Sequence, residues 1–229
     1  GPQPPNFQAI VALNRGPLAD GHPAVEALTP RQVQDKQAAG ALLVDVRTDL
    51  QFDDAHIPGS VCNPAVRAGF GTKLAWVADR DQEVVFIGRD DADAVRAVHL
   101  AAAVGIRNVA GYLGGGMTSW REEKRPIERV ERIDVTQLRE RADDVQILDV
   151  RSADEWEQGH IPGAVHTPYH DLTAIPDALD PQRPVAAICS SGQRSALAAS
   201  LLLRHGADEA IHVADGGVGT WAQQGWPIE

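Results

Sequence analysis

The chain has 229 residues, of which 43% are hydrophobic, so it can form one large domain or two smaller ones. Its net charge of -11 argues against nucleic acid or an anionic membrane as the main partner. Two cysteines are too few for a disulfide framework or a thiolate zinc site, and no apolar run approaches the ~18 residues that span a bilayer. Without a charged-then-apolar leader, the sequence predicts a cytoplasmic protein.

Residues 1–27 are rich in proline and predict a lead-in segment or tether rather than a domain. After them the sequence repeats itself. "LLVDVRTDLQFDDAHIPGSV" (42–61) matches "QILDVRSADEWEQGHIPGAV" (146–165), and "VVFIGRDDADAVRAVHLAAAVGI" (84–106) matches "VAAICSSGQRSALAASLLLRHGA" (185–207). Each copy then ends with a glycine pair and a tryptophan. A repeat near 100 residues indicates two domains, predicted over 28–126 and 127–229.

The second copy alternates short apolar runs with helical patterns. We expect strands over 145–150, 185–188 and 211–213, and helices over 153–158 and 195–205. This alternation predicts an α/β fold, in which a parallel sheet is flanked by helices. Ligands of such sheets bind beyond the carboxyl ends of the strands.

Cys189 directly follows the strand predicted over 185–188, at that functional end of the sheet. In a loop that joins a strand to a helix, successive amide groups can form an anion-binding nest, and Gly192 permits the backbone angles this requires. The helix start and Arg194 add positive charge, which should lower the pKa of a thiol. The loop therefore predicts an activated nucleophile rather than a buried structural cysteine.

The motifs "DVR…GHIPGA", "CSSGQRS" and "DGGVGTW" occur in order, and the chain over residues 28–229 resembles a tandem rhodanese (sulfurtransferase). The resemblance implies that Cys189 accepts a sulfane sulfur as a persulfide and passes it to a thiophilic acceptor. It implies no cofactor and no metal. Asp149 and Arg151 would support the site or serve the fold alone. The substrate-binding residues would be Ser190, Ser191, Gly192, Gln193, Arg194 and Ser195.

Two other readings stay open. Rhodanese-fold phosphatases and arsenate reductases resemble this chain, but their loop has five residues between cysteine and arginine, whereas four intervene here. A non-catalytic module that senses or docks persulfides is the second alternative, although such a module does not need amides gathered around a thiol. The donor could be thiosulfate or glutathione persulfide, and the acceptor a thiol or a cyanide-like nucleophile.

The first copy lacks this chemistry. Gly88 occupies the position of Cys189, and Asp90, Asp91 and Asp93 occupy its loop, where carboxylates would repel an anionic donor. We therefore expect the first domain to be catalytically inactive. Cys62 aligns with His166 and is predicted to be a packed loop cysteine.

The lead-in has a resemblance of its own. "PPNFQAIVALNRGPL" (4–18) looks like the segment that follows a metallo-β-lactamase-fold domain in fusions with rhodanese domains, which resemble persulfide dioxygenases. This resemblance implies that the chain is part of a longer fusion, and it makes a metallo-β-lactamase-fold domain a candidate partner.

Overall fold

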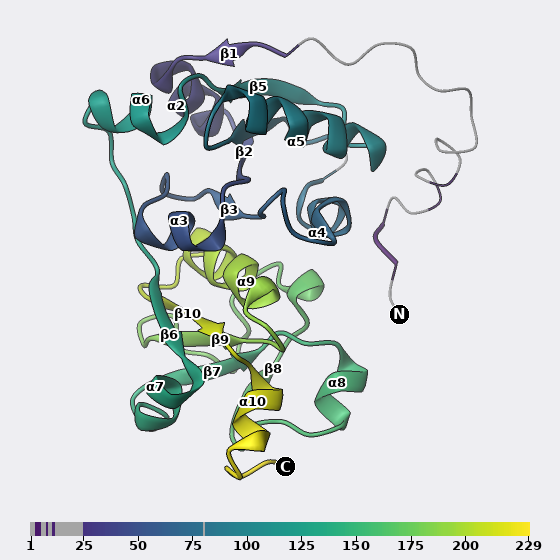
Figure 1. Ribbon diagram of the computed structural model, residues 1–229, viewed down its shortest axis with the longest axis vertical. Helices are drawn as coiled ribbons and strands as arrows, with labels where there is room; N and C mark the ends of the chain where they lie inside the picture. Colours follow the sequence, from purple (N-terminus) through teal and green to yellow (C-terminus); the bar gives the residue numbers. More distant parts are fainter. Residues whose placement is uncertain (1–2, 6–7, 9–10, 12–24, 80) are drawn as a thin grey trace. The chain divides into compact units, whose positions relative to one another are not determined.

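A computed structural model describes residues 3–5, 8, 11, 25–79 and 81–229, so the lead-in predicted over 1–27 lies mostly outside the described residues. The chain forms two compact units, and each contains a five-stranded parallel sheet (Figure 1). This arrangement confirms the predicted α/β fold and its duplication. No helix in the described part of the chain is both long and apolar enough to cross a bilayer.

The first sheet has the strand order β1-β5-β4-β2-β3. Every residue of β2 and β4 is buried, which explains why these segments have no polar alternation. The elements are β1 (Ala27–Leu28), α2 (Pro30–Ala38), β2 (Leu42–Asp45), β3 (Val61–Cys62), α4 (Phe70–Val77), β4 (Val84–Ile87), α5 (Asp91–Ala103), β5 (Val109–Leu113) and α6 (Gly116–Glu122).

The second sheet repeats the same order, as β6-β10-β9-β7-β8. Helix α9 lies on one side of this sheet, and α7 and α10 lie on the other (Figure 1). The elements are β6 (Glu131–Asp134), α7 (Val135–Glu140), β7 (Gln146–Asp149), α8 (Ala153–Glu157), β8 (Val165–His166), the 3-10 helix η1 (Tyr169–Asp171), β9 (Val185–Ile188), α9 (Gln193–Arg204), β10 (Ala210–Asp215) and α10 (Val218–Gln223).

The tryptophans that end the two copies are equivalent anchors. Trp120 and Trp221 are both almost fully buried. Each indole Nε1 donates a hydrogen bond to a backbone carbonyl six residues later, that of Pro126 at 2.8 Å and that of Pro227 at 2.9 Å. The indole thus packs its apolar surface in the core while its one donor is satisfied.

One segment of the first copy belongs to the second compact unit. Residues Asp49–Val61, which include helix α3 (Asp49–Asp54), group with Glu128–Glu229. His56 forms an antiparallel backbone bridge with Glu128, and Arg204 Nη1 donates a hydrogen bond to the carbonyl of Gly59 at 2.9 Å. The compact units therefore do not coincide with the sequence repeats.

Arg132 on the edge strand β6 connects this segment to the second sheet. Its Nη1 lies 2.9 Å from Asp49 Oδ2 and 3.1 Å from Asp53 Oδ2, and its Nη2 lies 3.4 Å from Asp215 Oδ1. Burial lowers the pKa of Arg132, but the hydrogen bonds from Asp49 and Asp53 outweigh it, and the pKa is raised. The guanidinium thus compensates two carboxylates that are themselves largely buried.

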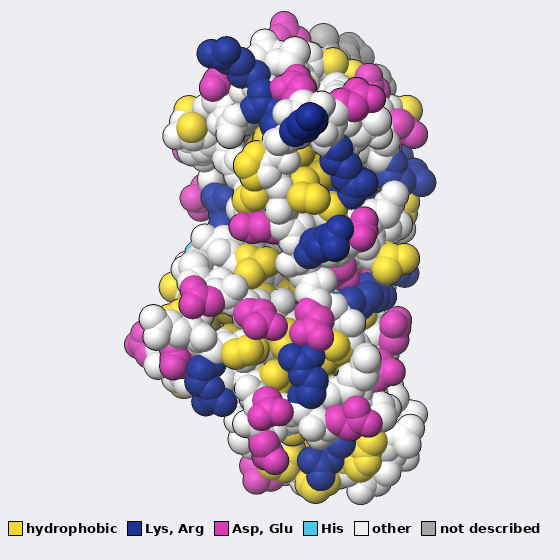
Figure 2. All heavy atoms as spheres, turned by 90° about the vertical axis from the view of Figure 1, so that its left-hand side faces the viewer, with side chains coloured by type: hydrophobic (Ala, Val, Ile, Leu, Met, Phe, Trp, Pro, Cys, Tyr) yellow, Lys and Arg dark blue, Asp and Glu magenta, His cyan; other side chains and the backbone are white. Residues whose placement is uncertain are grey.

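Figure 2 shows one face of the molecule, on which Lys and Arg side chains alternate with Asp and Glu. No continuous basic patch occurs among the described residues of that face. A nucleic-acid-binding face would carry clustered positive charge.

Replacing Arg132 should destabilise the second unit. Arg132→Met leaves Asp53 with one fewer compensating partner, and we expect a loss of about 1–3 kcal/mol in the free energy of unfolding. Arg141→Met is the matched control, since Arg141 pairs only with Glu131 at the surface and should cost under about 1 kcal/mol. Chemical denaturation of both variants measures the difference. Equal losses would contradict the structural importance of Arg132.

Candidate active site

Cys189 follows the carboxyl end of β9, between the ends of β7 and β10. The chain then turns through Gly192, which has φ +87° and ψ -19° and caps helix α9. A side chain at Gly192 would place its Cβ 2.2 Å from the carbonyl oxygen of Ala214, so only glycine fits. Helix α9 begins at Gln193, two residues before the predicted start, and Arg194 and Ser195 therefore lie in its first turn.

The loop curls around the sulfur of Cys189. Sγ accepts hydrogen bonds from the amide of Gly192 at 3.2 Å and from the amide of Ser191 at 3.5 Å, and the hydroxyl Oγ of Ser195 lies at 3.5 Å. Ser195 Oγ also donates to the carbonyl of Val213 at 2.9 Å. Cys189 and Ser195 are fully buried. The amides predicted to bind an anion thus converge on the thiol sulfur itself.

These contacts favour the thiolate form of Cys189. Burial raises the pKa of the thiol, but hydrogen bonds from Ser195 and the Ser191 amide, together with the charge of Arg194, outweigh burial and lower the pKa. A thiolate that is stabilised by fixed donors is the nucleophilic form of cysteine. The predicted activation of Cys189 therefore has a physical basis in this geometry.

The glycine pair of the "DGGVG" motif lies directly against the loop. A Cβ at Gly217 would fall 2.1 Å from the carbonyl oxygen of Cys189, so the backbone approach requires glycine there. The amide of Val218 donates a hydrogen bond to that same carbonyl at 3.1 Å. This bond fixes the peptide on the far side of Cys189 and explains why the motif accompanies the cysteine loop.

Arg194 is engaged by residues that the sequence analysis did not connect with it. Its Nη1 and Nη2 both bond the carboxylate of Glu155 on helix α8, with Nη2 to Oε1 at 2.7 Å, and Nη2 also donates to Ser190 Oγ at 2.7 Å. The hydrogen bond from Arg194 holds the pKa of Glu155 at about 2. Glu155 was missed because its local pattern, with Ser152 three residues earlier, indicates a capped helix start, which it also forms.

Asp149 and Arg151 form a bidentate pair at the end of β7, with Arg151 Nη2 2.6 Å from Asp149 Oδ2. Arg151 Nη2 also donates to the carbonyl of Gly159 at 2.9 Å. The equivalent pair Arg47 and Asp45 of the first copy has the same 2.6 Å contact. Since the copy without a cysteine retains this pair, the pair serves the fold, and the described hydrogen bonds of Arg151 do not reach Cys189.

An aromatic wall stands beside helix α8. The indole of Trp156 stacks on His160, with ring centroids 3.5 Å apart, and on His166 at 4.7 Å. His166 Nε2 lies 3.0 Å from the carbonyl of Arg151. Within the described residues no group of three or more His, Cys, Asp or Glu side chains is arranged to hold a metal ion.

The loop of the first copy is closed rather than open. A Cβ at Gly88 would lie 2.6 Å from the carbonyl oxygen of Asp90 and 2.7 Å from the amide of Ala94. Asp90 caps helix α5 by accepting from the amide of Asp93, and Asp93 pairs with Arg89 at 3.1 Å. The aspartates predicted to repel a donor thus bind groups of their own loop.

Two residues singled out in the sequence have less prominent positions. Cys62 is fully buried and lies in strand β3, so the predicted loop position was wrong. Gln193 opens α9, and no side-chain hydrogen bond joins it to the described residues.

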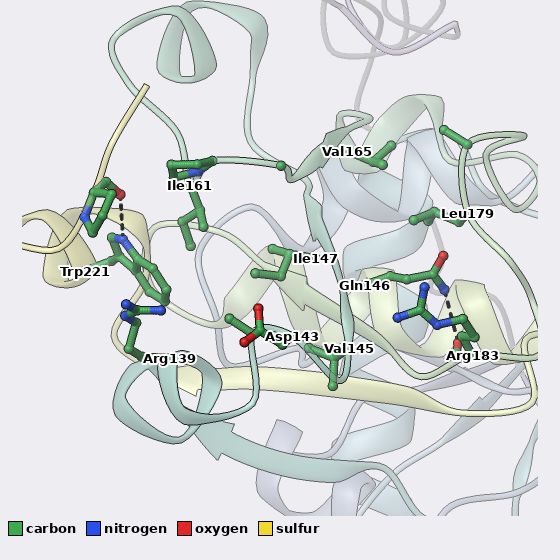
Figure 3. A pocket seen from close by; sticks show the side chains of 15 residues that line it. Arg139, Asp143, Val145, Gln146, Ile147, Ile161, Val165, Leu179, Arg183 and Trp221 are labelled. Atoms are coloured by element: carbon green, nitrogen blue, oxygen red, sulfur yellow. Dashed lines mark hydrogen bonds between the residues drawn. The ribbon is translucent and has the colours of Figure 1, made fainter.

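A cavity of about 500 Å³ lies elsewhere in the second unit (Figure 3). Figure 3 shows Ile147, Ile161 and Trp221 in its wall, with Arg139 beside the indole. Gln146, the first residue of β7, lines the cavity, whereas Cys189 follows the last residue of β9. Because β7 and β9 are parallel, this cavity and the cysteine loop lie toward opposite ends of the strands.

The pKa of Cys189 can be measured by alkylation in a Cys62→Ser background. The rate should rise with pH through a midpoint below the ~8.5 of a free thiol, since the thiolate forms above that midpoint. Arg194→Ala should raise the midpoint because a positive charge is lost, and Glu155→Gln should lower it because a neutralising carboxylate is lost. A wild-type midpoint at or above the free-thiol value would contradict the activation of Cys189.

The first copy should not regain a reactive site from one substitution. In a Cys189→Ser background, Gly88→Cys should show no sulfur transfer, because the added side chain collides with backbone atoms of its own loop. Replacing all of Gly88–Asp93 by the sequence of Cys189–Arg194 is the comparison, since it also removes the aspartates. Sulfur transfer by the single Gly88→Cys change would show that the first loop is not closed.

Comparisons with known proteins agree with this geometry. A family model described as "Rhodanese-like domain" matches residues 29–123 and 134–224. The chain is 33% identical over 102 residues to a protein named "Sulfurtransferase" from Allochromatium vinosum, covering 43% of this chain and 94% of that protein.

A second relative is the "Putative sulfur carrier protein YrkF" of Bacillus subtilis, 38% identical over 72 residues, where the match covers 31% of this chain and 39% of the relative. Among solved structures, a thiosulfate sulfurtransferase from Pseudomonas aeruginosa aligns over 90% of this chain and 43% of its own, with 21% identity and a TM-score of 0.40. The family matches over both halves show that the chain belongs to the rhodanese-like domain family, with two such domains in tandem.

Proposed function

We propose that this chain is a sulfurtransferase that carries sulfane sulfur as a persulfide on Cys189. The observation behind the proposal is the convergence of the Gly192 and Ser191 amides and the Ser195 hydroxyl on Sγ, which lowers the pKa of the thiol. Membership of the rhodanese-like family and a sulfurtransferase relative support sulfur transfer at the level of the family.

The reaction divides into two nucleophilic displacements. In the first, the Cys189 thiolate attacks the outer sulfur of the donor, a sulfur–sulfur bond forms on Sγ, and the donor leaves as a thiolate or, from thiosulfate, as sulfite. In the second, an acceptor thiolate or cyanide attacks the outer sulfur of the persulfide and releases the Cys189 thiolate. Electrons and charge balance in each step without an external oxidant.

The surroundings of Cys189 suggest the kind of donor. Ser190 and Ser191 are the exposed residues of the loop, so a donor reaches the sulfur beside them. Arg194 is already paired with Glu155, and the positive charge offered to a donor is correspondingly reduced. A singly charged group, such as the persulfide end of glutathione persulfide, therefore suits the site better than the dianion thiosulfate.

Loop length separates sulfur transfer from the phosphatase reading. Only four residues lie between Cys189 and Arg194. The amides within this short loop point at Sγ, and Arg194 bonds a carboxylate and a hydroxyl of the protein. A tetrahedral phosphate or arsenate would need those donors for its own oxygens.

The non-catalytic alternative predicts a persulfide that forms but is not passed on. Both readings use Cys189, and turnover distinguishes them. A partner with the metallo-β-lactamase fold, suggested by the resemblance of the lead-in, would be one consumer of persulfide that the chain passes on.

Cys189→Ser should abolish sulfur loading and transfer, because a serine hydroxyl is a poor nucleophile at neutral pH. Intact-mass spectrometry after exposure to glutathione persulfide or thiosulfate should show the gain of one sulfur atom in the wild type and none in the variant. Cys62→Ser is the control and should load normally. Loading that persists in Cys189→Ser and disappears in Cys62→Ser would overturn the site assignment.

A second arm of that experiment adds a thiol acceptor to the loaded protein. Loss of the added sulfur with repeated turnover supports a transferase. Loading without release to thiol or to cyanide would support the sensing or docking module instead.

A further inference from the structure

His212 lies in the middle of strand β10 and is fully buried. Its ring bridges two groups that are far apart in the sequence. Nε2 lies 2.7 Å from the carbonyl oxygen of Gly192, and Nδ1 lies 2.8 Å from Oδ2 of Asp53. Gly192 is the residue whose amide donates to the sulfur of Cys189. A buried polar chain thus runs from a carboxylate to the cysteine loop.

The hydrogen positions in this chain follow from the partners. A carbonyl oxygen only accepts, so Nε2 of His212 must carry a hydrogen and donate it to Gly192. That carbonyl also accepts the first hydrogen bond of helix α9, from the amide of Ala196 at 3.1 Å. One proton is shared between Nδ1 and Asp53. The peptide that follows Gly192 is therefore held by a helix bond on one side and by the histidine on the other.

Glycine gives that restraint its importance. Gly192 has the widest backbone freedom of any residue, and its amide points at Sγ only while its φ and ψ angles are fixed. The His212 bond acts on the carbonyl of the same residue. Fixing this carbonyl thereby fixes the amide that stabilises the thiolate.

Asp53 reaches His212 from helix α3, which belongs to the same compact unit although it lies 159 residues earlier in the chain. Its Oδ2 also accepts from Arg132, while Oδ1 is buried without a hydrogen-bond partner among the described residues. A buried carboxylate oxygen without a partner costs stability. Stability of the fold is thus a poor reason for an aspartate at this place.

The first copy provides an internal comparison. With the register that aligns Gly88 with Cys189, the position of His212 is occupied by Gly111. The copy without a cysteine therefore also lacks the histidine. By contrast, the Asp–Arg pair that serves the fold is present in both copies.

We propose that His212 and Asp53 are positioning residues for the cysteine loop: His212 holds the carbonyl of Gly192, and Asp53 holds the ring of His212. A segment of the inactive copy thereby completes the support of the reactive one. The inference deepens the proposed sulfurtransferase function and rests on it for its biological meaning. Its test is made on the thiol and needs no sulfur donor, so it remains decisive if sulfur transfer is not observed.

The first test removes the donor to Gly192. In a Cys62→Ser background of the full chain, His212→Phe keeps a ring but loses both nitrogens. The pH midpoint of Cys189 alkylation should rise, and the rate at neutral pH should fall about tenfold. Asp49→Asn is the matched control, because Asp49 lies on the same helix and bonds the same Arg132 but has no printed bond to His212, and its midpoint should stay at the wild-type value.

A folded His212→Phe protein with the wild-type midpoint would overturn the proposal. So would an Asp49→Asn midpoint that rises as far as that of His212→Phe, since general loss of carboxylate charge would then be the cause. Thermal unfolding of each variant shows whether it is folded at the temperature of the assay.

The second test asks whether Asp53 acts through His212. Asp53→Leu should raise the midpoint in the same direction, and the double variant should rise no further than His212→Phe alone, because both changes act on one hydrogen bond. Full additivity of the two shifts would show that Asp53 acts by another route.

A third measurement uses the wild-type chain and applies even if the variants do not fold. Nitrogen-15 NMR of the His212 ring should show a hydrogen on Nε2. A ring that is protonated on Nδ1 alone would place a lone pair against the Gly192 carbonyl and would exclude the proposed bond.

Discussion

The hydrogen bond from the Gly192 amide to the sulfur of Cys189 is the interaction on which the site depends. It exists because the chain turns back on itself within three residues, through backbone angles that favour glycine. The same turn starts helix α9 and brings Ser195 beside the sulfur. The reactive thiol and the start of the helix are therefore one structural feature, and neither can form without the other.

Several close backbone approaches stabilise this turn. Gly217 lies so near the carbonyl of Cys189 that no side chain fits, and Ala214 occupies the space beside Gly192. Strand β10 and the loop after it thus form the platform beneath the cysteine loop. Glu155 reaches the loop from the opposite direction, on helix α8, and holds the one arginine of its sequence. The loop is enclosed by packing below and by charge above.

Much of this arrangement could be predicted from the sequence. Strand β9, the position of Cys189 at its end, and the helix after it follow from an apolar run, a glycine and an Ala/Leu-rich segment. The duplication also assigned the inactive copy, because two aligned blocks show directly which residues differ. These features are local, or they are repeated within the chain, and both kinds of pattern can be recognised without coordinates.

The contacts that were missed share a physical cause. Glu155 meets Arg194 across 39 residues, and Asp53 meets His212 across 159. A single polar residue within a helix or an apolar strand carries no periodic signal, and its partner is defined only by the packing of whole elements. The assignment of Asp49–Val61 to the second unit is of the same kind, since the repeat places these residues in the first copy.

The closed loop around Gly88 has an evolutionary consequence. If the two copies descend from one duplicated ancestor, loss of the thiol in the first copy was followed by contraction of the backbone into the space that a side chain would fill. Aspartates then took over the vacated donors, and Asp90 now caps the helix. A mutation back to cysteine must displace these contacts at once, and each intermediate step loses stability before it gains reactivity. The asymmetry between the copies thus behaves as a ratchet, which commits one lineage of the duplicated loop to a structural future.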